Sequence, residues 1–489
     1  MNALARILEW PSQFEDTLGL ALWDAVEIAR AVGGVAVGQF QCAGVEIDSR
    51  DVVDGDLFFA LKGEAMDGHK FVDAAFAKGA AAVVVDRPVA GPHVLVNDTS
   101  IALELLAKAA RSRNLGKIIG VTGSVGKTGV KEAIFAALDR ASRGNAHRSV
   151  KSYNNHVGVP LSLARLPARA KYGVFEMGMN HAGEIAALTR QTRPDVAVIT
   201  TIAPAHIEML GSEEAIADAK AEIFEGLESG GIAVVPADSP HYARLKEAAE
   251  RHNIAVVSFG RAVHSSVRLL DAVPAPGGGS LVTADLGDRR ICYTVAEPGE
   301  HWIANSLAVM AAVRAVGGDL GSAGLALAEL QGMKGRGVRS QIAASGGDLS
   351  GRALLIDESY NANPASMCAT LAQLGATTAR RRIAVLGAMK ELGAHGPAYH
   401  AELAGPLRAA QIDHVVLVGD EMLVLADELG TATRHSLGNR PSFAHCGTAR
   451  QALERLREFG VEGGDAVLVK GSNSVGLGTL VAALMQNKE

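Results

Sequence analysis

The sequence predicts an α/β protein of three consecutive modules with mostly parallel sheets. The chain has 489 residues, and domains commonly contain about 100–200 residues. Short runs of β-branched residues alternate along the whole chain with longer amphipathic segments rich in alanine and leucine, a pattern typical of βαβ units. We therefore expect modules at residues 1–113, 114–325 and 326–489.

In the first module, three apolar runs predict strands: GDLFFAL, GAAAVVVD and HVLVND. Helices are expected near residues 71–78 and 101–113, and the polar stretch at 111–116 suits a linker. The module should therefore be a small α/β domain that ends close to residue 113.

The central module is expected to contain the longest α/β run. Its strands are predicted at KIIGVTG, YGVFEMG, DVAVITTI, GIAVVP and NIAVVSFG. Glycine and proline turns between alternating apolar residues at 268–295 predict a small antiparallel excursion, followed by a helix at 301–317.

The third module should be an open, doubly wound, Rossmann-like sheet. Its strand candidates are ALLIDESY, RRIAVLG, DHVVLVGD and AVLVKGS. The basic run Arg380, Arg381 and Arg382 directly precedes an apolar run, so we interpret it as a solvated loop that enters a strand.

Composition excludes several classes of protein. The net charge of -6 and the aromatic content of 4% argue against a nucleic-acid partner, which usually meets a basic patch or stacking aromatics. The four cysteines are scattered without a C-x-x-C pair, which fits a reducing cytoplasm. Neither a signal peptide nor an apolar stretch of about 18 residues is evident, so we expect a cytoplasmic protein without membrane insertion.

The strongest local motif is TGSVGKT at residues 122–128, between the strand KIIGV and the helix VKEAIFAALDR. Glycines let backbone N–H groups turn toward a phosphate, Lys127 neutralises its charge, and the Thr128 hydroxyl can ligate magnesium. Val121 stands where the usual pattern has its first glycine, so this is a variant phosphate loop. A glycine-rich turn can also serve only to connect a strand to a helix, but the Lys-Thr pair at the start of the helix favours phosphate binding.

Three further residues are candidate metal ligands. Glu176 closes the strand YGVFE and His206 follows the strand DVAVITTI, and ligands gather at such carboxyl ends in open α/β sheets. A carboxylate suits magnesium better than an imidazole does, and either residue could instead be a cap. Lys220 lies on a helix face with Ile216 and Ile223, where a lysine commonly extends its stem toward solvent.

Together these residues resemble the Mur ligases, whose phosphate loop, metal-binding glutamate and histidine, and carbamoylated lysine match Gly123–Thr128, Glu176, His206 and Lys220. The resemblance implies an ATP-dependent ligase with catalytic roles for Lys127, His206 and Lys220. It also implies two Mg²⁺ sites held through Thr128, Glu176, His206 and a carbamate on Lys220.

Other segments are similar to the branch of this family that adds D-alanyl-D-alanine. These are GVEIDSR, SYNNHVG, GEHWIANSLAV, KGR and LIDESYNANPASM. By this resemblance, ATP would contact Gly123, Ser124, Val125, Gly126, Lys127, Thr128, His301, Asn305, Arg336, Asp357, Tyr360 and Asn361. The other substrates would contact Asp48, Ser49, Arg50, Lys62, Asn154, Asn155 and Asn363.

The resemblance implies that ATP activates the carboxyl end of UDP-N-acetylmuramoyl-tripeptide as an acyl phosphate, which D-alanyl-D-alanine then attacks. The first module would bind the UDP precursor, and the third would close over ATP and bind the dipeptide, in a monomer. Two alternatives stay open. One is another amide ligase of the superfamily, either the tripeptide-forming enzyme or a folylpolyglutamate synthetase. The other is a regulatory nucleotide-binding protein without ligation.

This sequence departs from the family pattern at four places. Gly129 follows the loop threonine where a second Ser or Thr is common, and His156 stands where glutamate often follows the two asparagines. Glu358 replaces the second aspartate of an Asp-Asp pair, and GSNSVGLG at 471–478 replaces a Ser-Arg-Ser-Met-like ending. The last departure leaves the residues that contact the dipeptide open.

Overall fold

The structure is a computed structural model that describes residues 21–63, 66–205, 207–276, 278–344, 351–431 and 441–486. The described chain forms two compact units. One unit, here the first module, comprises the residues up to Leu115 together with Pro160–Ala170. The other comprises Gly116–Val159 and the residues from Lys171 onward, and it contains one sheet in a central module and another in a C-terminal module.

The first module is built on a five-stranded sheet in the order β2-β7-β6-β5-β4. Strands β4 to β7 pair in parallel and β2 is antiparallel to β7. Every residue of β5 and β6 is buried, as expected for parallel strands covered on both faces. The elements are β1 (Trp23–Asp24), α1 (Ala25–Val32), β2 (Val35–Val37), β3 (Gln41–Cys42), β4 (Gly44–Glu46), β5 (Asp56–Phe59), α2 (Val72–Ala77), β6 (Ala82–Val85), β7 (His93–Leu95), α3 (Thr99–Arg113) and α5 (Gly158–Ala164).

The returning segment Pro160–Ala170 is fastened to the first module by side-chain contacts. The Trp23 Nε1–H donates to the Ala164 carbonyl at 2.8 Å, and the Arg113 guanidinium lies 3.4 Å from the centre of the Trp23 ring. Arg165 pairs with the buried Glu46 at 2.6 Å. A segment from the middle of the sequence therefore completes this module, which the sequence alone did not indicate.

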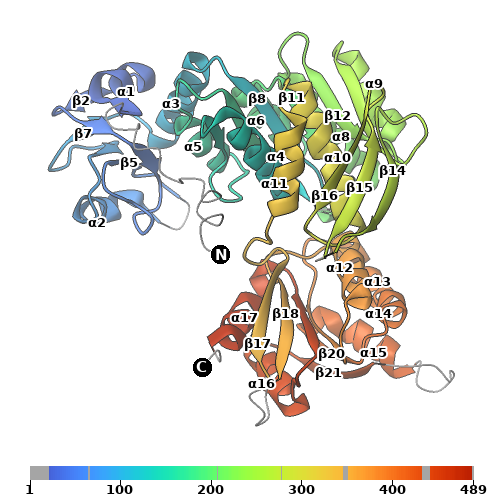
Figure 1. Cartoon of the computed structure of the whole chain (residues 1–489). Helices are drawn as coiled ribbons and strands as arrows, with labels where there is room; N and C mark the ends of the chain where they lie inside the picture. Colours follow the sequence, from blue (N-terminus) through green and yellow to red (C-terminus); the bar gives the residue numbers. More distant parts are fainter. Residues whose placement is uncertain are drawn as a thin grey trace, which may run out of the picture. The chain divides into compact units, whose positions relative to one another are not determined.

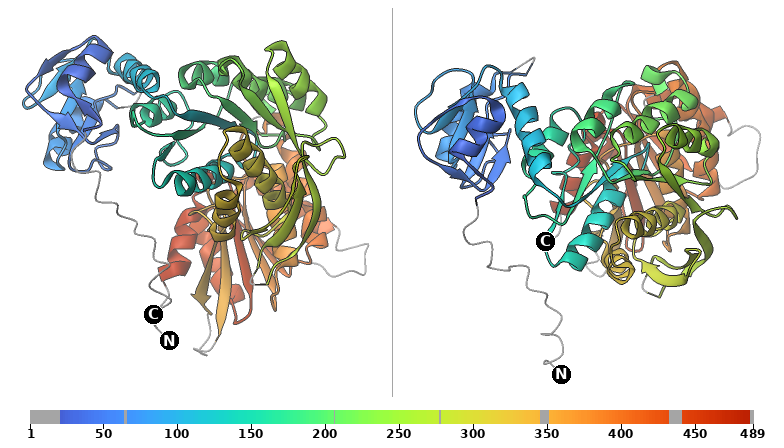
Figure 2. Two further views of the ribbon diagram at one scale, coloured as in Figure 1. Left: turned by 45° about the horizontal axis from the view of Figure 1, so that its top comes forward. Right: turned by 90° about the horizontal axis from the view of Figure 1, so that it is seen from above.

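The central module contains a nine-stranded sheet in the order β16-β15-β14-β13-β12-β11-β8-β10-β9. Strands β9 to β13 pair in parallel with β8 among them, and β14, β15 and β16 form the antiparallel excursion that the sequence predicted. These last strands are the long yellow-green ones in Figure 2. The elements are β8 (Lys117–Thr122), α4 (Lys127–Ser142), β9 (Ala146–Arg148), β10 (Tyr172–Glu176), α6 (Glu184–Thr192), β11 (Val196–Ile199), α7 (Ile207–Leu210), α8 (Glu213–Ala221), β12 (Ile232–Pro236), α9 (Tyr242–Arg251), β13 (Ala255–Gly260), β14 (Val267–Pro274), β15 (Ser280–Asp285), β16 (Arg290–Val295), α10 (Glu300–Ala315) and α11 (Leu320–Glu329).

Helices α4, α10 and α11 pack together over this sheet (Figure 1). Helix α10 is buried along the run Ser306–Val313, because it lies between the sheet and its neighbouring helices. A helix that is apolar all round is typical of such a buried position. The packing fixes the first turns of α4 and α10 next to each other.

The C-terminal module has a six-stranded sheet in the order β17-β18-β22-β19-β20-β21, parallel except for β17. The expected mostly parallel α/β fold is confirmed. The elements are β17 (Val338–Ala343), β18 (Arg352–Glu358), α12 (Pro364–Ala376), β19 (Arg382–Gly387), α13 (Gly396–Glu402), α14 (Ala404–Ala409), β20 (His414–Val418), α15 (Leu423–Thr431), β21 (Ser442–Cys446), α16 (Ala449–Phe459), β22 (Ala466–Lys470) and α17 (Leu477–Gln486).

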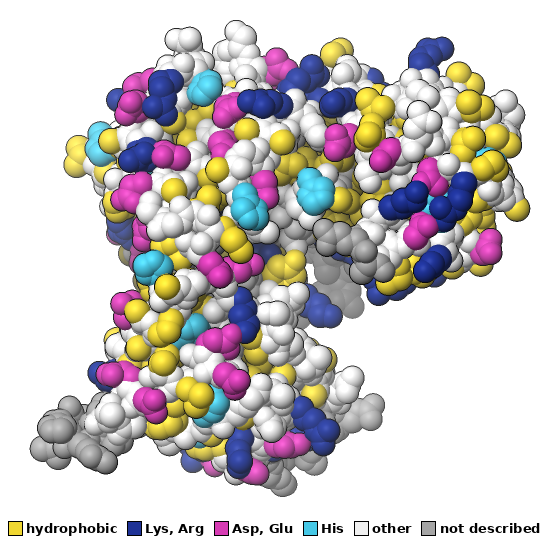
Figure 3. Space-filling view, turned by 180° about the vertical axis from the view of Figure 1, so that it is seen from behind, with side chains coloured by type: hydrophobic (Ala, Val, Ile, Leu, Met, Phe, Trp, Pro, Cys, Tyr) yellow, Lys and Arg dark blue, Asp and Glu magenta, His cyan; other side chains and the backbone are white. Residues whose placement is uncertain are grey.

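The described surface carries charges of both signs. Basic and acidic side chains are interspersed on the face drawn in Figure 3. Among the described residues, no helix has the length and apolar character needed to cross a membrane.

The interpretation of Arg380–Arg382 as a solvated loop is wrong for Arg381. Its guanidinium donates to both oxygens of the buried Asp465, at 3.0 and 2.6 Å, and lies 4.8 Å from the centre of the Phe459 ring. Asp465 also accepts the Glu462 N–H at 2.7 Å. The ion pair therefore joins the start of β19 to the loop before β22.

We expect Asp465→Ala to lower the free energy of unfolding of the C-terminal module by about 3 kcal/mol, because it leaves the Arg381 charge without its partner. Urea denaturation followed by circular dichroism measures the loss. Glu454→Ala is the matched control, since it breaks an exposed pair with Arg450 and should change stability by about 0.5 kcal/mol or less. Equal effects of the two variants would contradict the structural role of Asp465.

Candidate active site

The phosphate loop connects the end of β8 to the start of α4, as the sequence predicted. Gly123 has φ of +146° and Gly126 has φ of +87°. A Cβ on Gly123 would lie 1.9 Å from Thr200 Oγ1, and one on Gly126 would lie 2.9 Å from Asn305 Oδ1. Only glycine fits these positions, so the loop backbone lies directly against β11 and α10.

The first turn of α4 is left open for an anion. Gly126 is the N-cap residue, and no side chain caps the helix. Uncapped first-turn N–H groups at a helix N-terminus bind phosphate well. Lys127 Nζ donates to the Gly123 carbonyl at 2.7 Å, which holds the lysine across the loop. Burial lowers the Lys127 pKa, while nearby Glu176 opposes that shift.

Some buried oxygen atoms at the loop lack a hydrogen-bond partner among the described residues, and two of them belong to predicted metal ligands. They are Thr128 Oγ1 and Glu176 Oε2. The other Glu176 oxygen accepts the Asn154 amide at 2.7 Å, which orients the carboxylate. Buried oxygens are almost always hydrogen-bonded or bound to an ion or ligand, and hydroxyl and carboxylate oxygens are ligands that suit Mg²⁺. These residues therefore fit a magnesium ion.

Lys220, near the end of α8, is a buried lysine, with 1% of its surface exposed. No acid among the described residues forms an ion pair with it. Burial, reinforced by the charge of Lys127, lowers its pKa well below the ordinary value. The expectation that the Lys220 side chain extends toward solvent is therefore wrong, because its amine lies inside the protein.

His206 lies outside the described residues. Among the residues that are described, no group of three or more His, Cys, Asp or Glu side chains could hold a metal. A metal at the loop would therefore need mixed donors, such as a hydroxyl, one carboxylate and oxygens from a ligand or a modified side chain.

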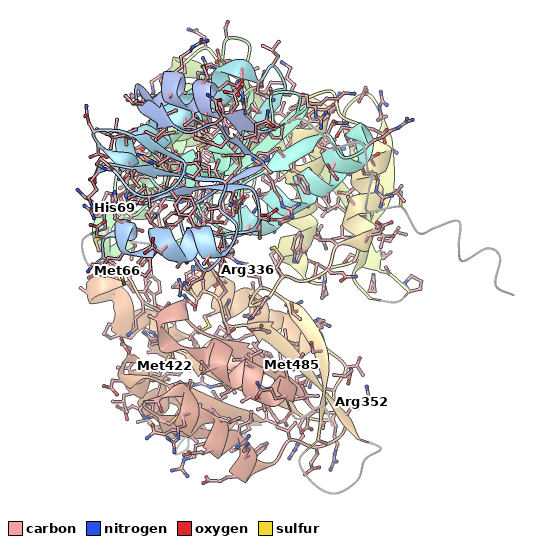
Figure 4. The ribbon with its side chains drawn as sticks, turned by 90° about the vertical axis from the view of Figure 1, so that its left-hand side faces the viewer. Met66, His69, Arg336, Arg352, Met422 and Met485 are labelled. Carbon is pink, nitrogen blue, oxygen red and sulfur yellow. The ribbon has the colours of Figure 1, made fainter. Side chains whose placement is uncertain are left out.

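The C-terminal module contributes Arg336 and Tyr360 to the same site. The Arg336 guanidinium lies 4.1 Å from the centre of the Tyr360 ring, and the Tyr360 and Ser152 hydroxyls are 2.7 Å apart. Figure 4 labels Arg336 on the segment that leads into β17. The Tyr360–Ser152 hydrogen bond thus connects the C-terminal module to the central one beside the phosphate loop.

Asp357 holds the backbone next to Arg336 and Tyr360 in place. Its carboxylate accepts the Gly335 N–H at 2.9 Å and the Ser359 hydroxyl at 2.6 Å. Both oxygens are therefore engaged by the protein. Asp357 positions the turn that carries Arg336 and does not itself line the cavity.

One cavity of about 390 Å³ collects most of the predicted residues of this unit. Its predicted lining residues are Ser124, Val125, Gly126, Lys127, Asn154, Asn155, Glu176, Lys220, His301, Asn305, Arg336, Tyr360, Asn361 and Asn363. Gly123, Thr128 and Asp357 are not among the residues that line it. Burial, with a contribution from Lys470, lowers the His301 pKa to about 4, so its imidazole is neutral at pH 7.

Two asparagines at the cavity also cap helices. Asn155 Oδ1 accepts the Gly158 N–H at 2.9 Å, at the start of α5, and Asn363 Oδ1 accepts the Ser366 N–H at 2.9 Å, at the start of α12. Their side-chain carbonyl groups are used locally. Each retains its amide N–H₂ for other contacts.

The remaining predicted residues lie in the first module, at the carboxyl ends of β4 and β5. Asp48 and Arg50 form an exposed ion pair at 2.6 Å, with Ser49 between them. Lys62 pairs with Asp86, which follows β6. This edge of a parallel sheet is the usual place for a ligand.

Sequence reasoning missed Lys470, which is buried at the end of β22 and lines the cavity. Its ammonium donates to the Asn361 carbonyl at 3.1 Å and lies 3.5 Å from Glu358 Oε2. The signal was available, because Lys470 ends the strand AVLVK just as Glu176 ends YGVFE. Its pairing with Glu358 gives a structural reason for the glutamate that replaces the usual aspartate.

Comparison with known proteins agrees with this geometry. Three family models match consecutive parts of the chain: the Mur ligase family catalytic domain at 41–114, the Mur ligase middle domain at 121–313, and the Mur ligase glutamate ligase domain at 345–473. The UDP-N-acetylmuramoyl-tripeptide–D-alanyl-D-alanine ligase of Synechocystis is 37% identical, over 90% of this chain and 91% of that protein.

Solved structures give the same result. The crystal structure of MurF from Acinetobacter baumannii is 30% identical and superposes with a TM-score of 0.80, over 95% of this chain and 99% of that one. MurF from Thermotoga maritima in complex with ADP is 26% identical, with a TM-score of 0.71 over 91% of this chain and 97% of that one. The chain therefore belongs to the Mur ligase family and groups there with the UDP-N-acetylmuramoyl-tripeptide–D-alanyl-D-alanine ligases, which confirms the resemblance found in its sequence.

Proposed function

We propose that this chain joins D-alanyl-D-alanine to the carboxyl end of UDP-N-acetylmuramoyl-tripeptide, a step of peptidoglycan synthesis. ATP activates the carboxylate as an acyl phosphate, and the products are UDP-N-acetylmuramoyl-pentapeptide, ADP and phosphate. The observation that carries the proposal is that one cavity is lined by Lys127 and Glu176 together with Arg336 of the C-terminal module.

The reaction needs charge neutralisation and alignment rather than a covalent protein nucleophile. A carboxylate that attacks a triphosphate brings negative groups together, and enzymes of this type act by positioning and electrostatic stabilisation. Lys127 and the first-turn N–H groups of α4 supply positive potential on one side of the cavity. Arg336 supplies it from the other side.

An acyl phosphate must be kept from water until the amine arrives. The stacked Arg336 and Tyr360 side chains, held by the Tyr360–Ser152 hydrogen bond of 2.7 Å, cover one wall of the cavity. Asp357 fixes the turn that carries them. These contacts support a site in which the C-terminal module covers the activated carboxylate.

Magnesium fits the donors beside the phosphate loop. Thr128, Glu176, His206 and a carbamate on Lys220 are the proposed ligands for two ions. When bound, Mg²⁺ would neutralise phosphate charge and polarise the phosphoryl oxygens. The unpartnered Thr128 Oγ1 and Glu176 Oε2 support this assignment.

A carbamate on Lys220 accounts for its surroundings. A buried ammonium without an acid partner is strongly unfavourable, and an ammonium cannot ligate a cation. Reaction of the neutral amine with carbon dioxide forms an N–C bond and releases one proton, which gives an anionic carbamate with two acceptor oxygens. That group would sit beside Lys127 with the favourable sign of charge.

The other two substrates are assigned to separate surfaces. We propose that Asp48, Ser49, Arg50 and Lys62 contact the UDP precursor in the first module. A second cavity, of about 340 Å³, borders Ser124 and Lys127 and is lined from the C-terminal module by Lys390 and Ser472–Ser474. It offers the dipeptide a cation and hydroxyl groups next to the loop. The module boundaries 1–113, 114–325 and 326–489, a monomeric state and a cytoplasmic location complete the proposal.

The acceptor amine distinguishes this function from the alternatives. Phosphate release is measured with D-alanyl-D-alanine, meso-diaminopimelate, lysine and glutamate, each with the precursor that its ligase would use. We expect turnover with D-alanyl-D-alanine only. Turnover with another amine would assign the chain to a different ligase, and no ADP release with any acceptor would favour a regulatory nucleotide-binding protein.

Lys127→Ala should reduce kcat by about a thousandfold or more, because the variant loses the charge that neutralises the phosphate oxygens. The measurement is ADP release at saturating substrates, with circular dichroism to verify folding. Lys171→Ala, which removes an exposed lysine just before β10, should retain activity. Near-normal turnover of Lys127→Ala would refute the phosphate-loop assignment.

Lys220→Ala should lower kcat by about a hundredfold or more, and added formate or acetate should restore part of it, because a small carboxylate can replace the carbamate oxygens as ligand. Rescue should rise with the concentration of the acid. Lys246→Ala, an exposed lysine of α9, serves as control and should show neither loss nor rescue. Full activity of Lys220→Ala without added acid would remove Lys220 from the site.

A further inference from the structure

Residue 129 and Trp302 share one space beside the phosphate loop. Gly129 is the third residue of α4, directly after the loop threonine. A Cβ placed there would lie 2.9 Å from Trp302 Cη2 and 3.1 Å from Cζ2. The indole therefore occupies the volume that a side chain at position 129 would fill, and any larger residue there would displace it.

Trp302 is placed at this point by the first turn of α10. It is partly buried and packs against the core of the central module, while its remaining surface lines the cavity together with Gly126, Gly129 and Asn305. The proposed nucleotide contacts on α10 are His301, directly before Trp302, and Asn305, three residues after it. An aromatic side chain thus faces the cavity between the phosphate loop and those contacts.

The indole N–H of Trp302 has no partner in the described part of the protein. Indole is a donor only, and no hydrogen bond from Trp302 Nε1 to any described residue is present. In contrast, the Trp23 Nε1–H donates to the Ala164 carbonyl at 2.8 Å. Partly buried indole N–H groups usually find an acceptor. The Trp302 atoms that meet Gly129 are Cη2, Cζ2 and Cζ3, and Nε1 lies on the neighbouring five-membered ring, two bonds from Cζ2.

We propose that Trp302 contacts the bound nucleotide in place of a side chain at position 129. Its indole, seated on Gly129, packs against the nucleotide and donates Nε1–H to a ribose or phosphate oxygen next to the first turn of α4. This step rests on the proposed function only in requiring that ATP binds at the phosphate loop. It explains why the loop threonine is followed by glycine in a chain that has tryptophan at position 302.

The test measures ADP affinity of the full chain by isothermal titration calorimetry. Trp302→Phe keeps an aromatic ring and removes the donor, so the Kd for ADP should rise about three- to tenfold, the range for one hydrogen bond. Trp302→Ala should weaken binding further. GDP affinity should fall by the same factor as ADP affinity, because ribose and phosphate oxygens are common to both. Trp23→Phe in the first module is the matched control and should leave the Kd unchanged.

A double-variant cycle tests the shared space. Gly129→Ser alone should weaken ADP binding, because its Cβ meets the indole. In the double variant with Trp302→Ala, the serine should cause little further loss of ADP affinity or should restore it. The effects of the two changes on the binding free energy should therefore not be additive. In turnover assays, Trp302→Phe should raise KM for ATP and leave KM for D-alanyl-D-alanine unchanged.

The outcomes separate this inference from the proposed function. Unchanged ADP affinity in both Trp302 variants, or strictly additive effects in the cycle, would overturn the role of Trp302 while leaving the ligase proposal in place. A loss confined to ADP and absent for GDP would overturn the ribose or phosphate contact. Failure of the unaltered chain to bind ADP would contradict the ligase proposal itself.

Discussion

The active site depends on two lysines that are withdrawn from water around one carboxylate. Lys127 is half-buried and Lys220 is buried, both line one cavity with Glu176, and burial lowers the pKa of each lysine. These lysines carry their positive charge at low cost only when anions lie beside them, because unpaired charge in a protein interior is strongly unfavourable. Nucleotide phosphates, a substrate carboxylate and a carbamate are the anions that the proposed reaction brings. The charge that these lysines favour thus matches the charge of the substrates.

The fold keeps this arrangement in place by anchoring the site to separate elements of the sheet. Lys127 follows β8 and Glu176 ends β10, which is paired with β8. The buried Lys131 supports the segment between β9 and α5, because its ammonium donates to the Lys151 carbonyl at 2.6 Å. That segment presents Asn154 to Glu176 and Ser152 to Tyr360. Lys131, one helical turn after Lys127, therefore supports the segment that makes both contacts.

Two departures from the family pattern are explained by contacts between residues far apart in the sequence. Gly129 leaves room for the Trp302 indole, and the Glu358 carboxylate pairs with the Lys470 ammonium at 3.5 Å. In each case a change of side-chain size or reach on one element is matched by a group on another. Arg381 is a similar case, because its guanidinium pairs with Asp465 within the C-terminal module instead of extending into solvent.

The sequence by itself determined the α/β class, the principal strands, the phosphate loop and the polar strand end at Glu176, because these depend on local periodicity and on glycine conformations coded within a few residues. The family resemblance added the other site residues. Only the tertiary structure decided that Lys220 is buried with no acid partner among the described residues, that Asp357 supports a turn instead of lining the cavity, and that Pro160–Ala170 belongs to the first module. It also revealed Lys470 and Trp302. These features arise from packing between elements separated by tens to hundreds of residues, and no local pattern specifies which side chains such packing brings together.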